Sequence, residues 1–276
     1  MALSRLKLGF ESRWGQQDRR ARWRCATGLV VFLALPLFSG CPSPAERHLQ
    51  EGHQQAKKAR WAEAAASYEA ASKADPGNAA AQALVGVANL RLNQRPLAAT
   101  AFGKALAIDP TSRQARLALG ELALDALDAG AALSLVDPLN TEREPGAALV
   151  RCRALLLRGA AGDREAAMNE ARRALSLDPA SAEARYLEGS VYLAMAQYAE
   201  AQMMFEELER NSRQSPFGPY GLARVAAAQR RSTDVLLYLK AARAASKGAW
   251  SPPAVAADPA FAFLAGSSAF TDVVGP

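Results

Sequence analysis

The side chains that could perform chemistry are few in this sequence. Its two histidines, His48 and His53, stand five residues apart, whereas two zinc ligands on one helical face are usually four apart. Neither a phosphate-binding loop, nor a Gly-x-Ser-x-Gly turn, nor a Cys-x-x-Cys pair occurs. We therefore predict that the chain binds no metal and no cofactor, and that it is not an enzyme.

One pair of carboxylates keeps an enzymatic alternative open. Glu121 and Asp125 are four residues apart, so on a helix they lie on the same face. A hydrolase of the cell envelope, or a regulator of one, would need such a pair in its groove. Acidic pairs are also common on solvated helices, so the non-enzymatic interpretation leads.

The N-terminus combines a basic stretch, an apolar run and a cysteine. Four arginines between positions 19 and 24 precede an apolar run over positions 26–38, which is short for a helix that spans a bilayer. This order is typical of a signal peptide. The run leads into Ser39-Gly40-Cys41, which resembles the cleavage box of bacterial lipoproteins.

This resemblance implies that residues 1–40 are a lipoprotein signal peptide, that Cys41 carries the lipid, and that residues 41–45 are a tether. Several acyl chains would hold the protein firmly on a membrane. By the same resemblance, Pro42 in place of aspartate favours the outer membrane, so we expect an envelope protein that faces the periplasm. An ordinary signal peptide cut near Gly40 is the alternative.

Removal of the signal peptide changes the charge of the chain. The whole chain has a net charge of +6, but residues 1–40 hold seven Lys and Arg against two Asp and Glu. The mature chain keeps 26 basic and 25 acidic residues, a net charge of +1, so no nucleic-acid partner is expected. We interpret the remaining basic pairs, Lys57-Lys58 and Arg230-Arg231, as solvated helix ends near a turn.

The cysteines allow no internal disulfide in the mature chain. Cys25 leaves with the signal peptide and Cys41 is assigned to lipid, which leaves Cys152 without a partner. Cys152 stands among apolar residues, so we predict a small packed side chain. A reactive thiol is the alternative.

An internal repeat organises the rest of the chain. Asp-Pro steps and glycines both recur at intervals of about 34 residues or of about twice that length, a period typical of helix-turn-helix units that stack into a solenoid. The steps that keep this interval are Asp75-Pro76, Asp109-Pro110 and Asp178-Pro179, and the glycines that keep it are Gly52, Gly86, Gly120 and Gly189. The chain is therefore predicted to be all-α.

The Asp-Pro steps also predict where helices end and begin. The residue before a proline is disfavoured in a helix, so each aspartate marks a helix end. Two residues after each proline stands a residue whose short side chain can cap the next helix. The predicted caps are Asn78, Ser112 and Ser181.

Within the units the residues resemble the tetratricopeptide repeat family. The second unit shows the match with Gly86, Ala98, Phe102 and Pro110. The small residues let two helices approach closely, and the aromatic ring fills the space beneath them. The first and fifth units keep this pattern.

Three units depart from the pattern. In the fourth, Leu155 and Ala171 stand where a glycine and an aromatic residue are expected. The third has Val136 in the aromatic position, and a sixth unit is expected around Gly221 and Leu237.

The resemblance implies a right-handed solenoid of about six helix-turn-helix units over residues 46–247, with a protein or peptide ligand in its concave groove. Residues on the inner face of the first helices are the candidates for this contact. Projection of the repeat gives His53, Lys57, Arg91, Glu121, Asp125, Tyr186 and Ser190. Tyr192 occupies a packing position of the family and is expected in the core.

Residues 248–276 break the repeat pattern. Pro252 and Pro253 interrupt it, and the apolar residues that follow, from Phe261 to Phe270 and beyond, predict two short amphipathic helices. They resemble the ending that closes many bacterial repeat solenoids, and they would cover the last apolar face. A free binding peptide is the alternative.

Together these features predict a lipid-anchored periplasmic scaffold or adaptor that binds another protein in a bacterial envelope complex. A narrower alternative is a pilotin-like factor, or an outer-membrane assembly factor, for a secretin, pilus or secretion system. Lipoproteins with this repeat include such factors. That alternative rests on architecture alone.

Overall fold

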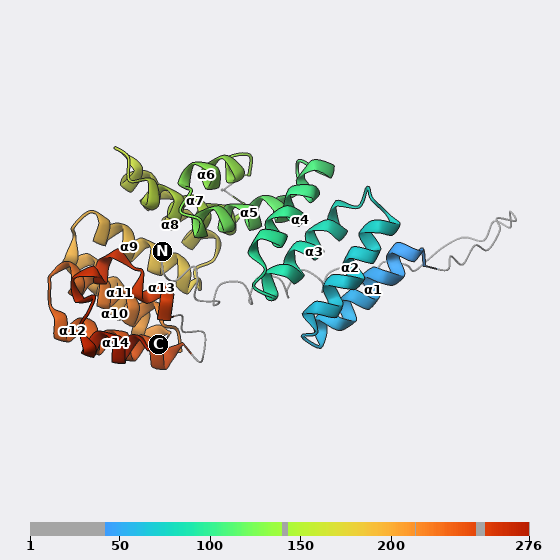
Figure 1. Cartoon of the computed structure of the whole chain (residues 1–276). Helices are drawn as coiled ribbons and strands as arrows, with labels where there is room; N and C mark the ends of the chain where they lie inside the picture. The colour runs from blue at the N-terminus through green and yellow to red at the C-terminus, as the bar shows by residue number, and fades with distance from the viewer. Residues whose placement is uncertain (1–41, 140–142, 213, 247–251, 276) are drawn as a thin grey trace, which may run out of the picture. The chain divides into compact units, whose positions relative to one another are not determined.

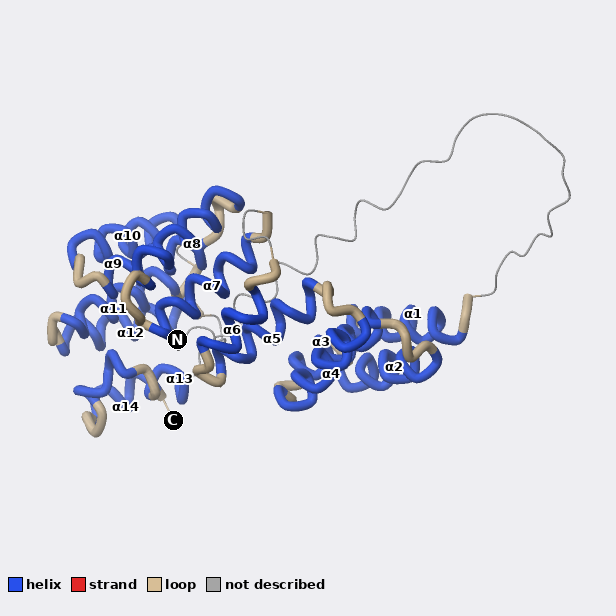
Figure 2. Tube along the Cα trace, turned by 90° about the horizontal axis from the view of Figure 1, so that it is seen from above, coloured by secondary structure: helices blue, strands red, loops and turns tan. Residues whose placement is uncertain are grey.

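The computed structural model describes residues 42–139, 143–212, 214–246 and 252–275, and within them it contains helices and turns but no strand (Figures 1 and 2). The repeat helices are α1 (Pro44–Lys57), α2 (Trp61–Ala74), α3 (Ala79–Arg91), α4 (Arg95–Ile108), α5 (Arg113–Asp125), α6 (Ala129–Val136), α7 (Pro145–Arg158), α8 (Asp163–Leu177), α9 (Ala182–Ala194), α10 (Tyr198–Asn211), α11 (Phe217–Ala228) and α12 (Ser232–Ala245). The chain divides into two compact regions, an N-terminal region that ends at Ala118 and a C-terminal region that begins at Leu119.

In the N-terminal region each helix packs against the next, from α1 to α4. The core between them is built from small residues around a ring: Tyr68 lies with Ala64, Val85, Ala88 and Ala101 in one buried cluster. Small residues allow these helices to lie close together, and the Tyr68 ring fills the space that remains within this cluster.

In the C-terminal region consecutive helices from α6 to α12 pack in the same way. The first helices of successive pairs also touch one another, because α7 packs against α9 and α9 against α11. They therefore form a continuous layer. Three short helices follow, α13 (Pro252–Ala256), the 3-10 helix η3 (Pro259–Leu264) and α14 (Ser268–Val274).

The predicted helix ends are confirmed. Helices α2, α4 and α8 end directly before Asp75, Asp109 and Asp178. Asn78 caps α3, since its Oδ1 accepts a hydrogen bond from the Ala81 N–H at 2.9 Å. Ser181 caps α9 in the same manner, and Ser112 lies directly before α5.

The predicted packing of glycine on an aromatic ring is confirmed as well. A Cβ atom at Gly86 would lie 2.8 Å from the ring of Phe102, which is fully buried. A Cβ atom at Gly189 would lie 2.6 Å from the ring of Phe205. No real Cβ comes so close to carbon, so glycine is required wherever the ring takes this place.

The turns inside the pairs share a feature that the sequence did not reveal. One residue in each of five turns has a positive φ although it is not glycine: Ala59, Asn93, Leu127, Ala196 and Arg230. The residue after it donates its N–H to a carbonyl five positions back, as Gln94 does to Asn89 at 2.8 Å. This is the Schellman arrangement at a helix C-terminus. It recurs with the repeat, but different residue types fill it.

The sixth unit lies where it was predicted, but its packing positions fall two residues after Gly221 and Leu237. Leu237 is 62% exposed, whereas Leu239 is fully buried. The repeat explains this, because one period of about 34 residues leads from Phe205 to Leu239. The same step from Gly189 leads to Ala223, which is fully buried too.

The boundaries of the predicted tether also change. Helix α1 begins at Pro44, within the predicted tether of residues 41–45. Ser43 caps the helix, with its Oγ accepting from the Glu46 N–H at 3.1 Å and its own N–H donating to the Glu46 carboxylate at 2.7 Å. Proline is well tolerated in the first helical turn, which favours this early start.

The short helices at the C-terminal end pack on the last pair. Helix α14 lies against α12, and η3 lies against α11. Phe261, Phe270 and Val274 are buried there, with the Phe261 ring edge-to-face on Tyr220 at 5.8 Å. The predicted cap is thus present, and the alternative of a free binding peptide is wrong.

Candidate functional site

The seven predicted contact residues all lie on first helices, but their environments differ. On α1, His53 and Lys57 are exposed. The His53 ring stands edge-to-face against Tyr68, with 3.1 Å between Nδ1 and the tyrosine oxygen. Burial raises the pKa of Tyr68. His53 thus covers the polar end of a core ring and keeps one face toward solvent.

Arg91 on α3 connects two turns of the N-terminal region. Its guanidinium lies over the ring of Trp61, 5.2 Å from the ring centre. Trp61 is the first residue of α2, so this contact joins the turn between α1 and α2 to the end of α3. Sequence reasoning missed Trp61, because it holds no position of the repeat pattern.

Glu121 on α5 forms an ion pair with Arg153 on α7. Glu183, in the first turn of α9, is 3.8 Å from the same guanidinium. Only 17% of the Arg153 side chain is exposed. Burial opposes its charge, but Glu121, Glu183 and Asp125 raise the pKa of Arg153 above its ordinary value. One arginine therefore links three successive first helices.

This cluster weakens the enzymatic alternative. A hydrolytic pair needs one carboxylate free to give up a proton and one free to accept it. Glu121 is instead held by Arg153, and the charge of Asp125 acts on the same guanidinium. Such an arrangement is that of a structural ion pair. Sequence reasoning missed Arg153 and Glu183, because they lie on other helices, far from Glu121 and from each other along the chain.

Tyr186 and Ser190 on α9 are buried, so we leave them out of the proposed contact surface. The Tyr186 ring packs between Phe205 and Phe217, with ring centres 5.5 and 5.3 Å away. Ser190 donates its hydroxyl to the Tyr186 carbonyl at 2.8 Å. The next unit covers this face, which the position within one repeat could not indicate.

Tyr192, which was expected in the core, is partly exposed. Its hydroxyl lies 3.4 Å from Nη2 of Arg172, and the same arginine also reaches Glu188 from its Nε at 3.4 Å. The side chain therefore combines packing with a polar contact between α8 and α9.

A buried polar cluster fixes the C-terminal helices. Tyr220 donates its hydroxyl to Asp258 at 2.7 Å, and Arg224 Nε lies 3.7 Å from the same carboxylate. Tyr220 and Arg224 follow Tyr186 and Ser190 by one period of the repeat. They therefore hold the equivalent positions on α11, the first helix of the last pair. Burial raises the pKa of Tyr220. The layer of first helices is thus closed at this end by the chain itself.

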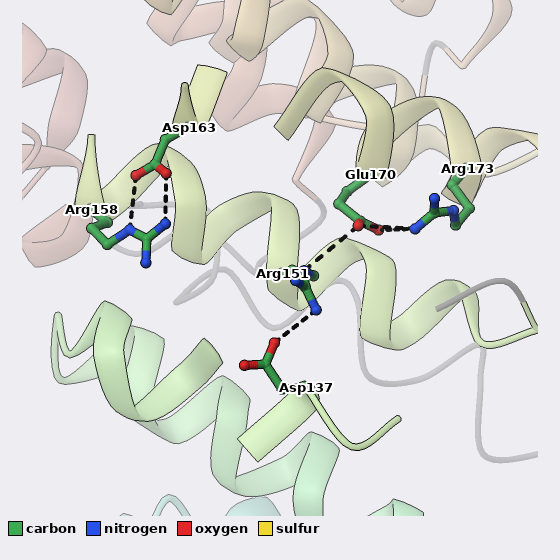
Figure 3. Close-up of polar contacts among 6 residues, drawn as sticks. All are labelled: Asp137, Arg151, Arg158, Asp163, Glu170 and Arg173. Carbon is green, nitrogen blue, oxygen red and sulfur yellow. Dashed lines mark hydrogen bonds and ion pairs between the residues drawn. The ribbon is translucent and has the colours of Figure 1, made fainter. Parts of the chain in front are cut away.

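Figure 3 shows a further set of charged contacts around the fourth helix pair, α7 and α8. Arg158 donates two hydrogen bonds to Asp163, from Nε at 2.9 Å and from Nη2 at 2.6 Å, across the turn between α7 and α8. The hydrogen bond from Arg158 holds the pKa of Asp163 below its usual range. Two glycines with positive φ, Gly159 and Gly162, shape this turn.

Arg151 bridges two pairs in the same view (Figure 3). It donates to Asp137 at 2.7 Å, and its Nε is 3.6 Å from Glu170, which Arg173 also contacts at 3.0 Å. The carboxylate of Glu170 is almost fully buried, so these two arginines compensate its charge. The basic side chains shown here are engaged within the fold.

Cys152 is fully buried, as predicted. Burial raises the pKa of its thiol to about 12, so the thiolate that would make it reactive is scarce at neutral pH. Cys41, the predicted site of lipidation, lies outside the described residues.

The described part of the chain lacks two features. It brings together no cluster of three or more His, Cys, Asp or Glu that could hold a metal ion. None of its helices is both long and apolar enough to cross a membrane.

Comparison with known proteins gives matches among solved structures. No family model and no curated protein matches the sequence. A tetratricopeptide repeat protein from Parabacteroides merdae matches with a TM-score of 0.61 at 18% identity, covering 74% of this chain and 79% of that one. A thermophilic protein of the same repeat type from Thermus thermophilus has a TM-score of 0.55 at 21% identity, covering 62% and 93%.

PilF of Pseudomonas aeruginosa is similar to the same degree. Its TM-score is 0.55 at 16% identity, with 71% of this chain and 89% of PilF covered. At such identities the likeness shows the fold alone. The chain is an all-α tetratricopeptide-type array of stacked helix pairs, as its repeat predicts, and proteins with this architecture present extended surfaces for protein binding.

Proposed function

We propose that this chain is a lipid-anchored scaffold that binds another protein on the periplasmic side of a bacterial envelope. The observation that carries the proposal is the repeat architecture. Stacked first helices, such as α7, α9 and α11, give an extended face for a partner. An adaptor needs no more than this.

The lipid anchor rests on the sequence around Cys41, and the start of α1 supports its mechanical role. Pro42 and Ser43 alone separate Cys41 from the helix. A lipid on Cys41 would therefore hold the first helix pair directly at the membrane surface. Two or more acyl chains make such attachment stable.

The narrower alternative is an assembly factor for a secretin, pilus or secretion system at the outer membrane. The likeness to PilF is compatible with it, but shows the fold alone. We do not extend the proposal to an envelope hydrolase, because Glu121 is held by Arg153.

The test compares the full-length chain with a Cys41→Ala variant in a bacterial host. We expect the native chain to remain with the membrane fraction, to gain the mass of a lipid on Cys41, and to crosslink to one envelope protein in quantity. The variant should lose membrane retention. If the variant stays on the membrane with unchanged partners, the lipid anchor is wrong; if the native chain captures no partner, the scaffold is wrong.

A further inference from the structure

The turns of the first two helix pairs carry a concentration of positive charge. Between Asp75 and Asp109 the sequence has no acidic residue, although Arg91, Arg95 and Lys104 fall there. The first turn adds three more cations. The cations next to the two turns are Lys57, Lys58, Arg60, Arg91 and Arg95, and the sequence sets one carboxylate close to them, Glu63.

The structure places the two turns side by side. Arg91, the last residue of α3, stacks on Trp61, the first residue of α2, at 5.2 Å. We call this surface the basic edge: it consists of the five cations named above and of Trp61. Lys57, Lys58 and Arg60 are exposed, and Leu97, two residues after Arg95 in the first turn of α4, is 55% exposed.

Helix stability does not explain this charge. Lys57 and Arg91 stand in the last turns of their helices, where a cation is favourable. Arg60, however, is the N-cap of α2, and Arg95 is the first residue of α4, where a cation opposes the helix dipole. Neither helix has a side-chain cap. Two basic residues are thus kept where they hinder folding.

The last helix pair also has a basic residue at the N-terminus of its second helix. Arg231 is also an N-cap residue, that of α12. It is paired with Asp234 in the first turn, with Nη1 and Oδ2 2.7 Å apart. The first turn of α2 has Glu63 three residues after Arg60, whereas the first turn of α4 contains no acidic residue.

We propose that the basic edge binds an acidic segment of the partner protein, with an apolar side chain of that segment against Trp61 and Leu97. Charge complementarity selects the acidic partner, and an aromatic ring with an arginine beside it is a frequent anchor of protein interfaces. The inference rests on the proposed function and names the chemistry of its partner.

The anchor argues for a protein and against a lipid surface. Cys41 precedes the start of α1, whereas Lys57 ends this helix of 14 residues. A helix of this length is about 21 Å long. The basic edge and the proposed lipid therefore lie at opposite ends of α1, which favours a protein partner for the basic edge.

The test uses full-length protein in detergent micelles and a fluorescein-labelled peptide of Glu-Glu-Leu repeats, with a Lys-Lys-Leu peptide as its counterpart. We expect fluorescence anisotropy to show binding of the acidic peptide alone, weakened by salt. The Arg60→Ser/Arg95→Ser variant should bind about tenfold more weakly. Its melting temperature should be unchanged or higher, so a loss of binding cannot be attributed to unfolding.

The control is Arg210→Ser/Lys240→Ser, which removes two exposed cations from α10 and α12. It should bind the acidic peptide as the native chain does. Equal loss in both variants, or binding of the basic peptide, would overturn the proposal. So would binding of vesicles with anionic lipid that depends on Arg60 and Arg95 while the peptide does not bind.

Crosslinking in the envelope separates this inference from the proposed function. If the native chain captures a partner and the Arg60→Ser/Arg95→Ser variant captures it equally well, the scaffold stands and the basic edge is wrong. If neither captures any protein, the proposed function itself is wrong.

Discussion

The two regions of the molecule use charge in opposite ways. Residues 42–118 hold ten Lys and Arg against six Asp and Glu, a net charge of +4, whereas residues 119–276 hold 16 against 19, a net charge of −3. In the second region, arginines such as Arg153 and Arg151 join neighbouring helices through buried or half-buried carboxylates. In the first, cations gather at the turns. One repeat fold thus carries an internal network in one region and a charged surface in the other.

The regions also differ in how a helix pair is filled. In the second pair Phe102 fills the space beneath Gly86. In the fourth pair the large and small residues are exchanged: Leu155 is buried at the glycine position, and Ala171 is fully buried at the aromatic one. The summed volume of the two side chains is nearly the same in both pairs, although the glycine and aromatic pattern is lost in the fourth. A degenerate unit can therefore still pack.

The largest effect is expected from Phe102→Ala. The ring is fully buried beneath Gly86, so its removal leaves a cavity that glycine cannot fill. We expect a loss of about 3–5 kcal/mol in the free energy of unfolding, measured by urea denaturation. Leu97→Ala, at a side chain that is 55% exposed, is the control and should cost less than about 0.5 kcal/mol. A small loss for Phe102→Ala would mean that the ring is not central to the pair.

Arg153→Leu tests the internal network. It would leave Glu121 and Glu183 without the cation that they share, so we expect a loss of about 3 kcal/mol in the free energy of unfolding. Arg60→Ser in the other region should have the opposite sign, a gain of about 0.5–1 kcal/mol, because serine caps a helix and arginine opposes its dipole. If both substitutions destabilise equally, the two regions do not differ in their use of charge.

The exchange of volumes in the fourth pair is tested by a double-mutant cycle. Leu155→Gly and Ala171→Phe should each destabilise, the first by a cavity and the second by overpacking. Together they restore the glycine and aromatic pattern. We therefore expect the double variant to lose about 0.5–3 kcal/mol less free energy of unfolding than the two single losses added together. Simple additivity would show that the two positions do not share one space.

Asp258→Asn tests the polar contact that holds the C-terminal helices. Burial would raise the pKa of Asp258, but Arg224, the Ala260 N–H and the Tyr220 hydroxyl lower it. A lowered pKa in the folded state means that the ionised group stabilises the fold above its unfolded pKa of about 3.9 and that this stability is lost as the pH falls through the folded value.

The free energy of unfolding of the native chain should therefore fall more steeply below about pH 4 than that of the Asp258→Asn variant. Chemical denaturation at a series of pH values measures the difference. Asp272→Asn, at an exposed position of α14, serves as the control and should keep the native slope. Parallel curves for the native chain and Asp258→Asn would contradict the assignment.

The smallest effect is expected from Leu127→Gly. Leu127 has a φ of 62° in the turn before α6, and 59% of its side chain is exposed. Glycine adopts a positive φ without steric cost. The free energy of unfolding, obtained from thermal melting curves, should therefore rise by up to about 1 kcal/mol. Asn93→Gly is the comparison in the other region and should gain less, because asparagine tolerates this conformation.

Much of the fold could be predicted from the residues because its rules are local. A proline such as Pro76 or Pro110 ends the preceding helix through its own backbone geometry. The aromatic residue that packs on a glycine such as Gly86 follows it by a fixed number of residues. The candidate site was less predictable. Tyr186 was expected at the surface and is buried, because Phe217 of the following unit covers it.

The amino-acid sequence by itself determined the period, the helix ends and the residues that must be small, since these follow from backbone preferences and from spacing within one unit. Only the tertiary structure decided which charges meet. Arg153 finds Glu121 and Glu183 on different helices, and Arg91 finds Trp61 across two turns. Such contacts depend on the offset between stacked helices, a quantity that packing sets and that no single unit contains.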